Sequence, residues 1–177
     1  MYGINDIFPE FVLEACMPDN TLGTVDSSSE NIEKVLDDKW KVYYFYPKDF
    51  TFICPTEIKD FDELVDVENV EVFGFSGDNE FCKLNWRKND DLIKDIRHPL
   101  IADTGLNLSR ELGIVDEDNG VCLRATYICN EKNIIQHVSV NALDTGRNVD
   151  EIIRTLEALR AGGLTGCSWS PGDKFVG

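Results

Sequence analysis

Cys54 is the residue best placed to do chemistry. It stands in the stretch YPKDFTFICPTEIKDF, residues 46–61, where an aromatic-rich loop meets a predicted helix. Apolar residues recur at helical spacing from Ile58 to Val65, and Pro55 suits the first helical position because its missing N–H would have been unpaired there anyway. A thiol at a helix N-terminus faces unpaired N–H groups and the positive end of the helix dipole, and both favour the nucleophilic thiolate. The alternative is that Cys54 is a small buried hydrophobe, the commonest fate of a free cysteine.

Thr51 and Pro47 could complete a reactive site around this cysteine. Thr51 lies three positions before Cys54, so its hydroxyl could be aimed at the same point as the sulfur. The rigid ring of Pro47 could pack beside the sulfur and limit the access of water. The alternative is a turn that starts at the proline, in which the threonine bonds to its own backbone.

The cysteines and the two histidines indicate whether the chain forms disulfides and whether it binds a metal. An even number of cysteines in a short secreted chain would suggest a disulfide framework. The start of this chain carries Asp6 and Glu10 but neither a basic residue nor a continuous apolar run, so we expect a cytoplasmic protein with reduced thiols. No C-x-x-C pair occurs, and His98 and His137 lie far apart, so we expect no metal site. The six cysteines are Cys16, Cys54, Cys82, Cys122, Cys129 and Cys167.

The sequence around Cys54 predicts alternating strands and helices. Two short apolar runs, 41–47 and 70–76, are rich in β-branched and aromatic residues, as expected for parallel strands buried on both faces. Together with the helix after Cys54 they predict a β-loop-α-β unit. The order of all predicted elements is that of a thioredoxin-like α/β fold with a mixed central sheet flanked by helices. The further elements are a helix over 79–89, a strand near 99–103, a helix at 106–112, a hairpin turning at 130–133, and a helix from Asn148 to Gly162.

Composition and charge narrow the class of protein. The chain has 177 residues, of which 42% are hydrophobic and 28% charged, as is ordinary for one globular domain. Its formal net charge of −16 would repel phosphate backbones and anionic lipids, so we expect neither nucleic-acid nor membrane partners. Only 26–31 and 116–120 resemble linkers, and both are short enough to be loops.

The loop before Cys54 resembles the signature of a known family. Pro47, Thr51 and Cys54 match the pattern P-x-x-x-T-x-x-C of the peroxiredoxins, and YPKDFTFICPTE is similar to the alkyl hydroperoxide reductase C-type, or typical 2-Cys, branch of the AhpC/TSA family. The resemblance continues through LNW, HPLIADTG, RATYIC, GRNVDEIIRTLEALRAGGL and CSWSPGDKF. It therefore covers most of the chain from about residue 40 onward.

The resemblance implies a role for two of the cysteines. Cys54 matches the cysteine that attacks the peroxide, and Cys167 matches the resolving cysteine. It divides the chain into a thioredoxin-like peroxiredoxin domain, residues 1–163, and a C-terminal tail, residues 164–177, that carries Cys167. The other four cysteines are most simply structural, with Cys82 as the alternative resolving thiol.

Three charged residues also match family positions. Arg124 in LRATYIC matches the active-site arginine, and Glu57 and Arg147 match a supporting glutamate and arginine. An arginine on a mostly apolar strand is costly unless it meets an anion, so Arg124 beside a thiolate has a local reason to exist. The alternatives are an edge-strand arginine that projects into water for Arg124, a solvated first-turn acid for Glu57 and a loop charge for Arg147.

The activity implied by the resemblance is thiol-dependent reduction of hydrogen peroxide and organic hydroperoxides to water and alcohols. Cys54 would become a sulfenic acid and then form an intersubunit disulfide with Cys167 of the partner subunit, without a metal or organic cofactor. The implied partners are a second copy, in a homodimer that can assemble into decameric or dodecameric rings, and a reductant such as thioredoxin or a dedicated reductase. A redox sensor, a holdase or a non-enzymatic structural dimer are the alternatives.

Overall fold

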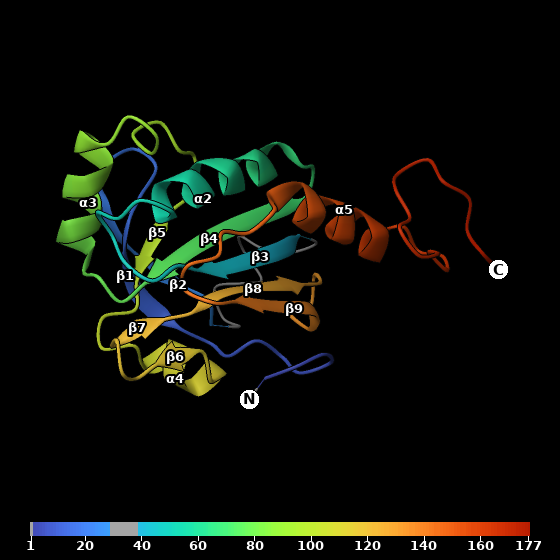
Figure 1. The fold of residues 1–177 in the computed structure, drawn as a ribbon, viewed down its shortest axis with the longest axis horizontal. Helices are drawn as coiled ribbons and strands as arrows, with labels where there is room; N and C mark the ends of the chain where they lie inside the picture. Colours follow the sequence, from blue (N-terminus) through green and yellow to red (C-terminus); the bar gives the residue numbers. More distant parts are fainter. Residues whose placement is uncertain (1, 29–38) are drawn as a thin grey trace. The chain divides into compact units, whose positions relative to one another are not determined.

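A seven-stranded mixed sheet organises most of the chain (Figure 1). The computed structural model describes residues 2–28 and 39–177, and the chain divides after Gly146 into two units, the second running from Arg147 to Gly177. Along the sheet the strands follow the order β2-β1-β5-β4-β3-β8-β9, with β4 parallel to β3 and β5 and the other pairs antiparallel. The strands are β1 Val12–Cys16, β2 Leu22–Asp26, β3 Trp40–Phe45, β4 Val70–Ser76, β5 Leu100–Ala102, β8 Arg124–Cys129 and β9 Ile135–Asn141, with a separate hairpin of β6 Val115–Asp116 and β7 Val121–Cys122.

The helices of the first unit lie where the sequence predicts them. These are α2 Cys54–Phe61, which continues as a 3₁₀ turn over Asp62–Asp66, α3 Glu80–Asn89 and α4 Asn107–Leu112. The thioredoxin-like fold with its mixed sheet is confirmed. Helix α2 begins at Cys54 itself, so Pro55 is its second residue rather than its first.

The hairpin of β1 and β2 was not predicted from the sequence. Both strands are half exposed, and Gly23 and Glu14 interrupt their apolar pattern, so neither forms a continuous hydrophobic run. Cys16 is the last residue of β1 and is buried. Of the two predicted loops, residues 117–120 form the turn between β6 and β7, whereas residues 29–31 of the other lie outside the described residues.

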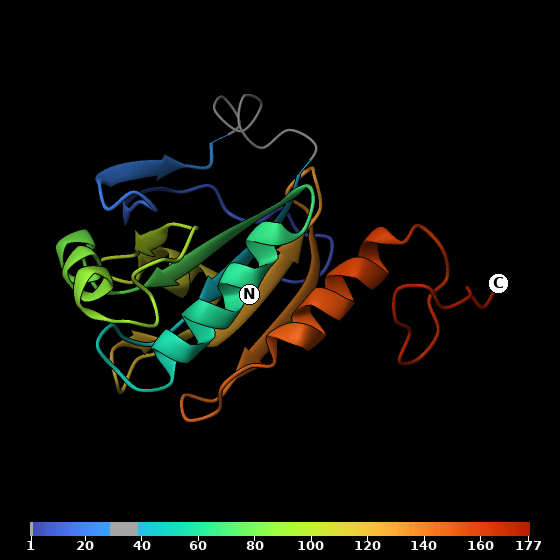
Figure 2. The ribbon, with the colours of Figure 1, turned by 90° about the horizontal axis from the view of Figure 1, so that it is seen from above.

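Both faces of the central strands are buried, and their side chains alternate between two layers. Tyr43 and Phe45 of β3 belong to a cluster that also contains Phe8 and residues of α4. Tyr44, which points to the opposite face, stacks on Phe61 of α2 with ring centroids 4.0 Å apart. Helix α2 therefore covers one face of the sheet, along which it runs in Figures 1 and 2.

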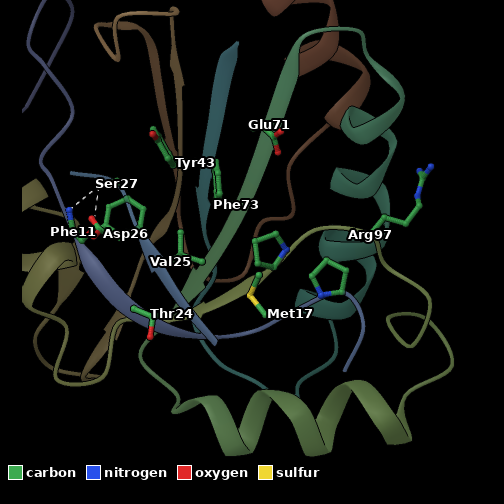
Figure 3. A pocket seen from close by; sticks show the side chains of 12 residues that line it. Phe11, Met17, Thr24, Val25, Asp26, Ser27, Tyr43, Glu71, Phe73 and Arg97 are labelled. Carbon is green, nitrogen blue, oxygen red and sulfur yellow. Dashed lines mark hydrogen bonds between the residues drawn. The ribbon is translucent and has the colours of Figure 1, made fainter. Parts of the chain in front are cut away.

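A hollow of about 430 Å³ lies beside the β1–β2 hairpin (Figure 3). It is lined by apolar side chains such as Val25, Tyr43 and Phe73, and at its rim the hydroxyl of Ser27 bonds the backbone of Phe11. No cysteine is among the described residues that line it. Within the described parts of the chain, every helix is too short or too polar to cross a membrane.

The second unit consists of α5, Val149–Arg160, and a loop that folds back on itself. The Asn148 side chain caps the helix by accepting from the Glu151 N–H, as predicted. After Gly162, the loop is closed by a hydrogen bond from the Val176 N–H to the Leu164 carbonyl. Among its other contacts, Trp169 stacks on Phe175, and Arg154 donates a hydrogen bond to the Trp169 carbonyl.

His98 joins the 3₁₀ turn after α2 to β3 through two hydrogen bonds. Its Nδ1 lies 2.8 Å from an Asp62 oxygen and its Nε2 lies 2.7 Å from the Tyr44 hydroxyl. A neutral imidazole satisfies both, donating from Nδ1 and accepting at Nε2. Burial lowers the pKa of His98, although the neighbouring Asp62 opposes this.

We expect this histidine to make the fold less stable in mild acid. Below its ordinary pKa of about 6.5 the unfolded chain binds a proton that buried His98 does not, so the free energy of unfolding should fall from pH 7.5 to 5.5 by up to about 1.4 kcal/mol per pH unit. Urea denaturation should show that His98→Gln removes this fall and that His137→Gln, the matched control, retains it. An identical pH dependence in His98→Gln and the parent would contradict the assignment.

Candidate active site around Cys54

Cys54 lies at the carboxyl end of the parallel strands, where a loop from β3 enters α2. Only 1% of the surface of Cys54 is exposed to solvent. In the first turn, Pro55 has no N–H, while Thr56 and Glu57 both donate to the Ile53 carbonyl. Among the described residues no hydrogen bond from the Cys54 N–H is found, and this N–H lies next to the sulfur of the same residue.

Arg124 and Glu57 lie against the sulfur and form a buried ion pair. The Arg124 Nη1 is 2.7 Å from Glu57 Oε2 and 3.5 Å from Cys54 Sγ, and the Arg124 Nε donates to the Leu143 carbonyl at 2.8 Å. Both charged residues are buried. β8 lies between β3 and β9, so Arg124 is not on an edge strand and does not project into water. Glu57 is likewise not a solvated first-turn acid.

Thr51 and Pro47 lie half-buried in the loop that leads to Cys54. The Thr51 hydroxyl donates to the Lys48 carbonyl at 2.9 Å, which is the local turn bond weighed above as the alternative. Because the hydroxyl proton is used in this way, the oxygen can only accept a further hydrogen bond.

Cys167 and Arg147 belong to the second unit. Cys167 is exposed and lies in the closed loop after α5. Arg147, the first residue of that unit, is half-buried and is not part of α5.

The other four cysteines are in environments that favour the thiol. Burial raises the pKa of Cys16 and Cys129. Cys122 is buried and donates to the Tyr46 carbonyl at 2.9 Å. Burial, followed by the charges of Asp49 and Asp78, raises the pKa of Cys82 to about 11. A thiol is a much weaker nucleophile than a thiolate, so these side chains are poor candidates for attack on a peroxide.

A second buried ion pair, which the sequence analysis missed, lies behind the reactive loop. Lys83 of α3 and Asp49 of the loop have side chains with 0% exposure, and the Lys83 Nζ is 3.3 Å from Asp49 Oδ1. The sequence did carry one indication that Lys83 is buried: it lies three residues before Trp86 and so on the same face of a helix. Asp49, Asp78 and Cys82 have ligand atoms within 4.8 Å of one another, but the Lys83 ammonium already supplies the positive charge beside Asp49.

Neutralising Glu57 should destabilise the fold, because it leaves the Arg124 charge buried with no carboxylate beside it. We expect Glu57→Gln to lower the free energy of unfolding by roughly 3 kcal/mol, the scale on which one partner of a buried pair is removed. Asp60→Asn, at an exposed position of the same helix, should change it by less than about 0.5 kcal/mol. Equal effects of the two substitutions in chemical denaturation would show that the buried pair contributes nothing particular.

Comparison with known proteins gives the family. The model of the AhpC/TSA family matches residues 4–138. The chain is 38% identical to alkyl hydroperoxide reductase C of Mycolicibacterium smegmatis, over 98% of this chain and 92% of that protein. It is 40% identical to a putative peroxiredoxin of Bacillus subtilis, over 95% of this chain and 94% of the other.

Solved structures agree with the sequence comparison. The reduced 2-Cys peroxiredoxin of Plasmodium vivax superposes with a TM-score of 0.87 at 33% identity, covering 98% of this chain and 92% of its own. AhpC of Mycobacterium bovis superposes with a TM-score of 0.82 at 36% identity, covering 96% and 98% of the two chains. The matched family model, the near-complete relatives and the shared fold lead to one conclusion: the chain belongs to the AhpC/TSA family of peroxiredoxins and alkyl hydroperoxide reductases C, which are thiol peroxidases.

Proposed function

We propose that this protein reduces hydrogen peroxide and organic hydroperoxides with Cys54 as the attacking thiolate. The observation that carries the proposal is the buried triplet of Cys54, Arg124 and Glu57, in which one guanidinium nitrogen donates to both the sulfur and the carboxylate. A cation held against sulfur in a buried site favours the thiolate, and the start of α2 adds the positive end of its dipole.

The first step is a displacement at oxygen. The Cys54 thiolate attacks the terminal oxygen of the hydroperoxide, so that an S–O bond forms as the O–O bond breaks. Sulfur is oxidised to the sulfenic acid, and the leaving oxygen is reduced and takes up a proton to give water or an alcohol. The step needs no metal and no organic cofactor.

Hydrogen-bond donors near the sulfur stabilise the negative charge that develops on the two oxygens of the hydroperoxide. Arg124 and the Cys54 N–H can donate to them, as a breaking O–O bond requires. The Thr51 oxygen can accept from the hydroperoxide O–H, and Pro47 shields the loop from water. Glu57 holds Arg124 in place. The resemblance adds Arg147 to this set as a supporting cation.

The second step needs a thiol that can reach a buried sulfur. Cys54 is 1% exposed, so the first turn of α2 must unwind before a second thiol can attack. We assign that thiol to Cys167, which is exposed in the tail, residues 164–177, that follows the catalytic domain of residues 1–163. Its attack on the sulfenic acid forms the S–S bond and releases water.

The proposed unit is a homodimer in which Cys54 pairs with Cys167 of the partner subunit. Strand β9 forms one edge of the sheet, and an edge strand offers backbone groups to a second copy. Further assembly into decameric or dodecameric rings follows from the resemblance. We propose thioredoxin or a dedicated reductase as the source of electrons and the cytoplasm, a reducing compartment, as the location.

The pairing of the two cysteines can be read on a gel. Peroxide-treated protein should run as a covalent dimer without reductant and as a monomer with it. Cys167→Ser should still complete the first reduction of peroxide but stop at the sulfenic acid, or at the sulfinic acid after a second equivalent, whereas Cys54→Ser should consume none. Mass spectrometry of the trapped species provides the measurement.

Cys82→Ser is the matched control, because Cys82 lies outside the triplet and its raised pKa keeps it in the thiol form. It should form the covalent dimer and turn over as the parent does, with thioredoxin or a dedicated reductase offered in turn. Normal turnover and a covalent dimer in Cys167→Ser would instead assign the second step to another thiol.

A further inference from the structure

The loop between β3 and α2 is tied to the body of the protein by one buried side chain. Asp49 Oδ1 accepts hydrogen bonds from the Tyr46 hydroxyl at 2.8 Å, from Ser76 at 3.0 Å and from Lys83 at 3.3 Å. The Asp49 N–H donates to Asp78 at 2.8 Å. Through these bonds the loop is attached to the end of β4 and to α3.

Lys83 is the centre of this arrangement. Its ammonium donates to Asp49, to the Tyr46 hydroxyl and to Ser76, and it lies 5.0 Å from the centroid of the Tyr46 ring. The side chain is fully buried, and Asp49 is the carboxylate with which it forms an ion pair. Removing either charge therefore leaves the other buried and uncompensated, which weakens the attachment of the loop.

The loop is also held in a strained conformation directly after Asp49. Phe50 has φ of 55°, in the left-handed region that bulky residues rarely occupy, and its ring lies 5.8 Å from that of Trp86. Such a residue persists only where its surroundings impose the conformation. Unwinding of the loop releases this strain, so the Asp49 attachment has to oppose that release.

We propose that Lys83 is a positioning residue that acts through Asp49 to hold the reactive loop closed. The inference rests on the proposed function of Cys54 and adds a residue that touches neither the sulfur nor the peroxide. The closed loop presents Thr51 and the Cys54 N–H for the first step. The second step requires the same loop to open, so Lys83 should favour attack on peroxide and oppose disulfide formation.

Lys83→Met tests the proposal because it keeps an unbranched side chain, shorter by one atom, and removes the charge. In single turnovers of the full-length protein, sulfenic acid formation should become roughly tenfold slower, as expected when reacting groups are misplaced. Disulfide formation, followed by rapid quenching and non-reducing gels, should become faster than in the parent. Asp49→Asn should shift both rates in the same directions, and it provides the test if Lys83→Met does not fold.

Arg87→Met is the matched control on the same helix. Arg87 is also buried, but its bonds run to Asn20 and to the carbonyls of Pro18 and Ile96, away from the loop. It should lower stability while leaving the ratio of the two rates as in the parent. Lys83→Met and Asp49→Asn with both rates unchanged, or both slowed alike, would overturn the proposal.

Hydrogen exchange separates this inference from the proposed function. Amides of residues 48–56 should exchange faster in reduced Lys83→Met than in the parent or in Arg87→Met, with no peroxide present. If the parent consumed no peroxide, the proposed function would fall and exchange alone would decide whether Lys83 holds the loop. Unchanged exchange in these amides would overturn it.

Discussion

The Arg124 guanidinium, buried between a sulfur and a carboxylate, is the interaction on which the site depends. A buried cation is costly unless it is paired and its remaining protons are satisfied. Here Glu57 supplies the carboxylate, the Leu143 carbonyl accepts from Nε, and the Cys54 sulfur lies 3.5 Å from Nη1. The contacts with Glu57 and Cys54 bring β8 and the first turn of α2 together. Stability of this region and the proposed role of Cys54 in attack on peroxide are therefore tied to one arrangement.

The sheet determines where this arrangement can form. The parallel strands β3 and β4 end at the same edge, and the loop after β3 must turn there to enter α2. Tyr44 and Phe61 stack beneath the helix, so its axis is fixed by the core while its first turn stays free of side-chain caps. Such a helix can hold Cys54 in place for attack on a peroxide, and its first turn can unwind while the rest of the helix stays packed.

Much of this could be predicted from the sequence because the signals were local. Buried apolar runs predict β3 and β4, and Cys54 followed by proline predicts the start of α2. The hairpin of β1 and β2 was missed because half-exposed strands carry no continuous apolar run. The partnership of Lys83 with Asp49 joins residues 34 positions apart through side chains alone, which neither periodicity nor spacing encodes. The family resemblance assigned Arg124 and Glu57 to the site, but only the structure shows that they pair with each other.

The most direct measurement is the second-order rate constant for the reaction of reduced Cys54 with hydrogen peroxide in Arg124→Met, followed by stopped-flow fluorescence. The account predicts a rate at least about tenfold below that of the parent, or about 1.4 kcal/mol of lost transition-state stabilisation. The matched control is Arg110→Met, which removes an exposed arginine paired with Glu117 and should react at the parent rate. An Arg124→Met protein that also reacts at the parent rate would contradict the central role of the buried guanidinium.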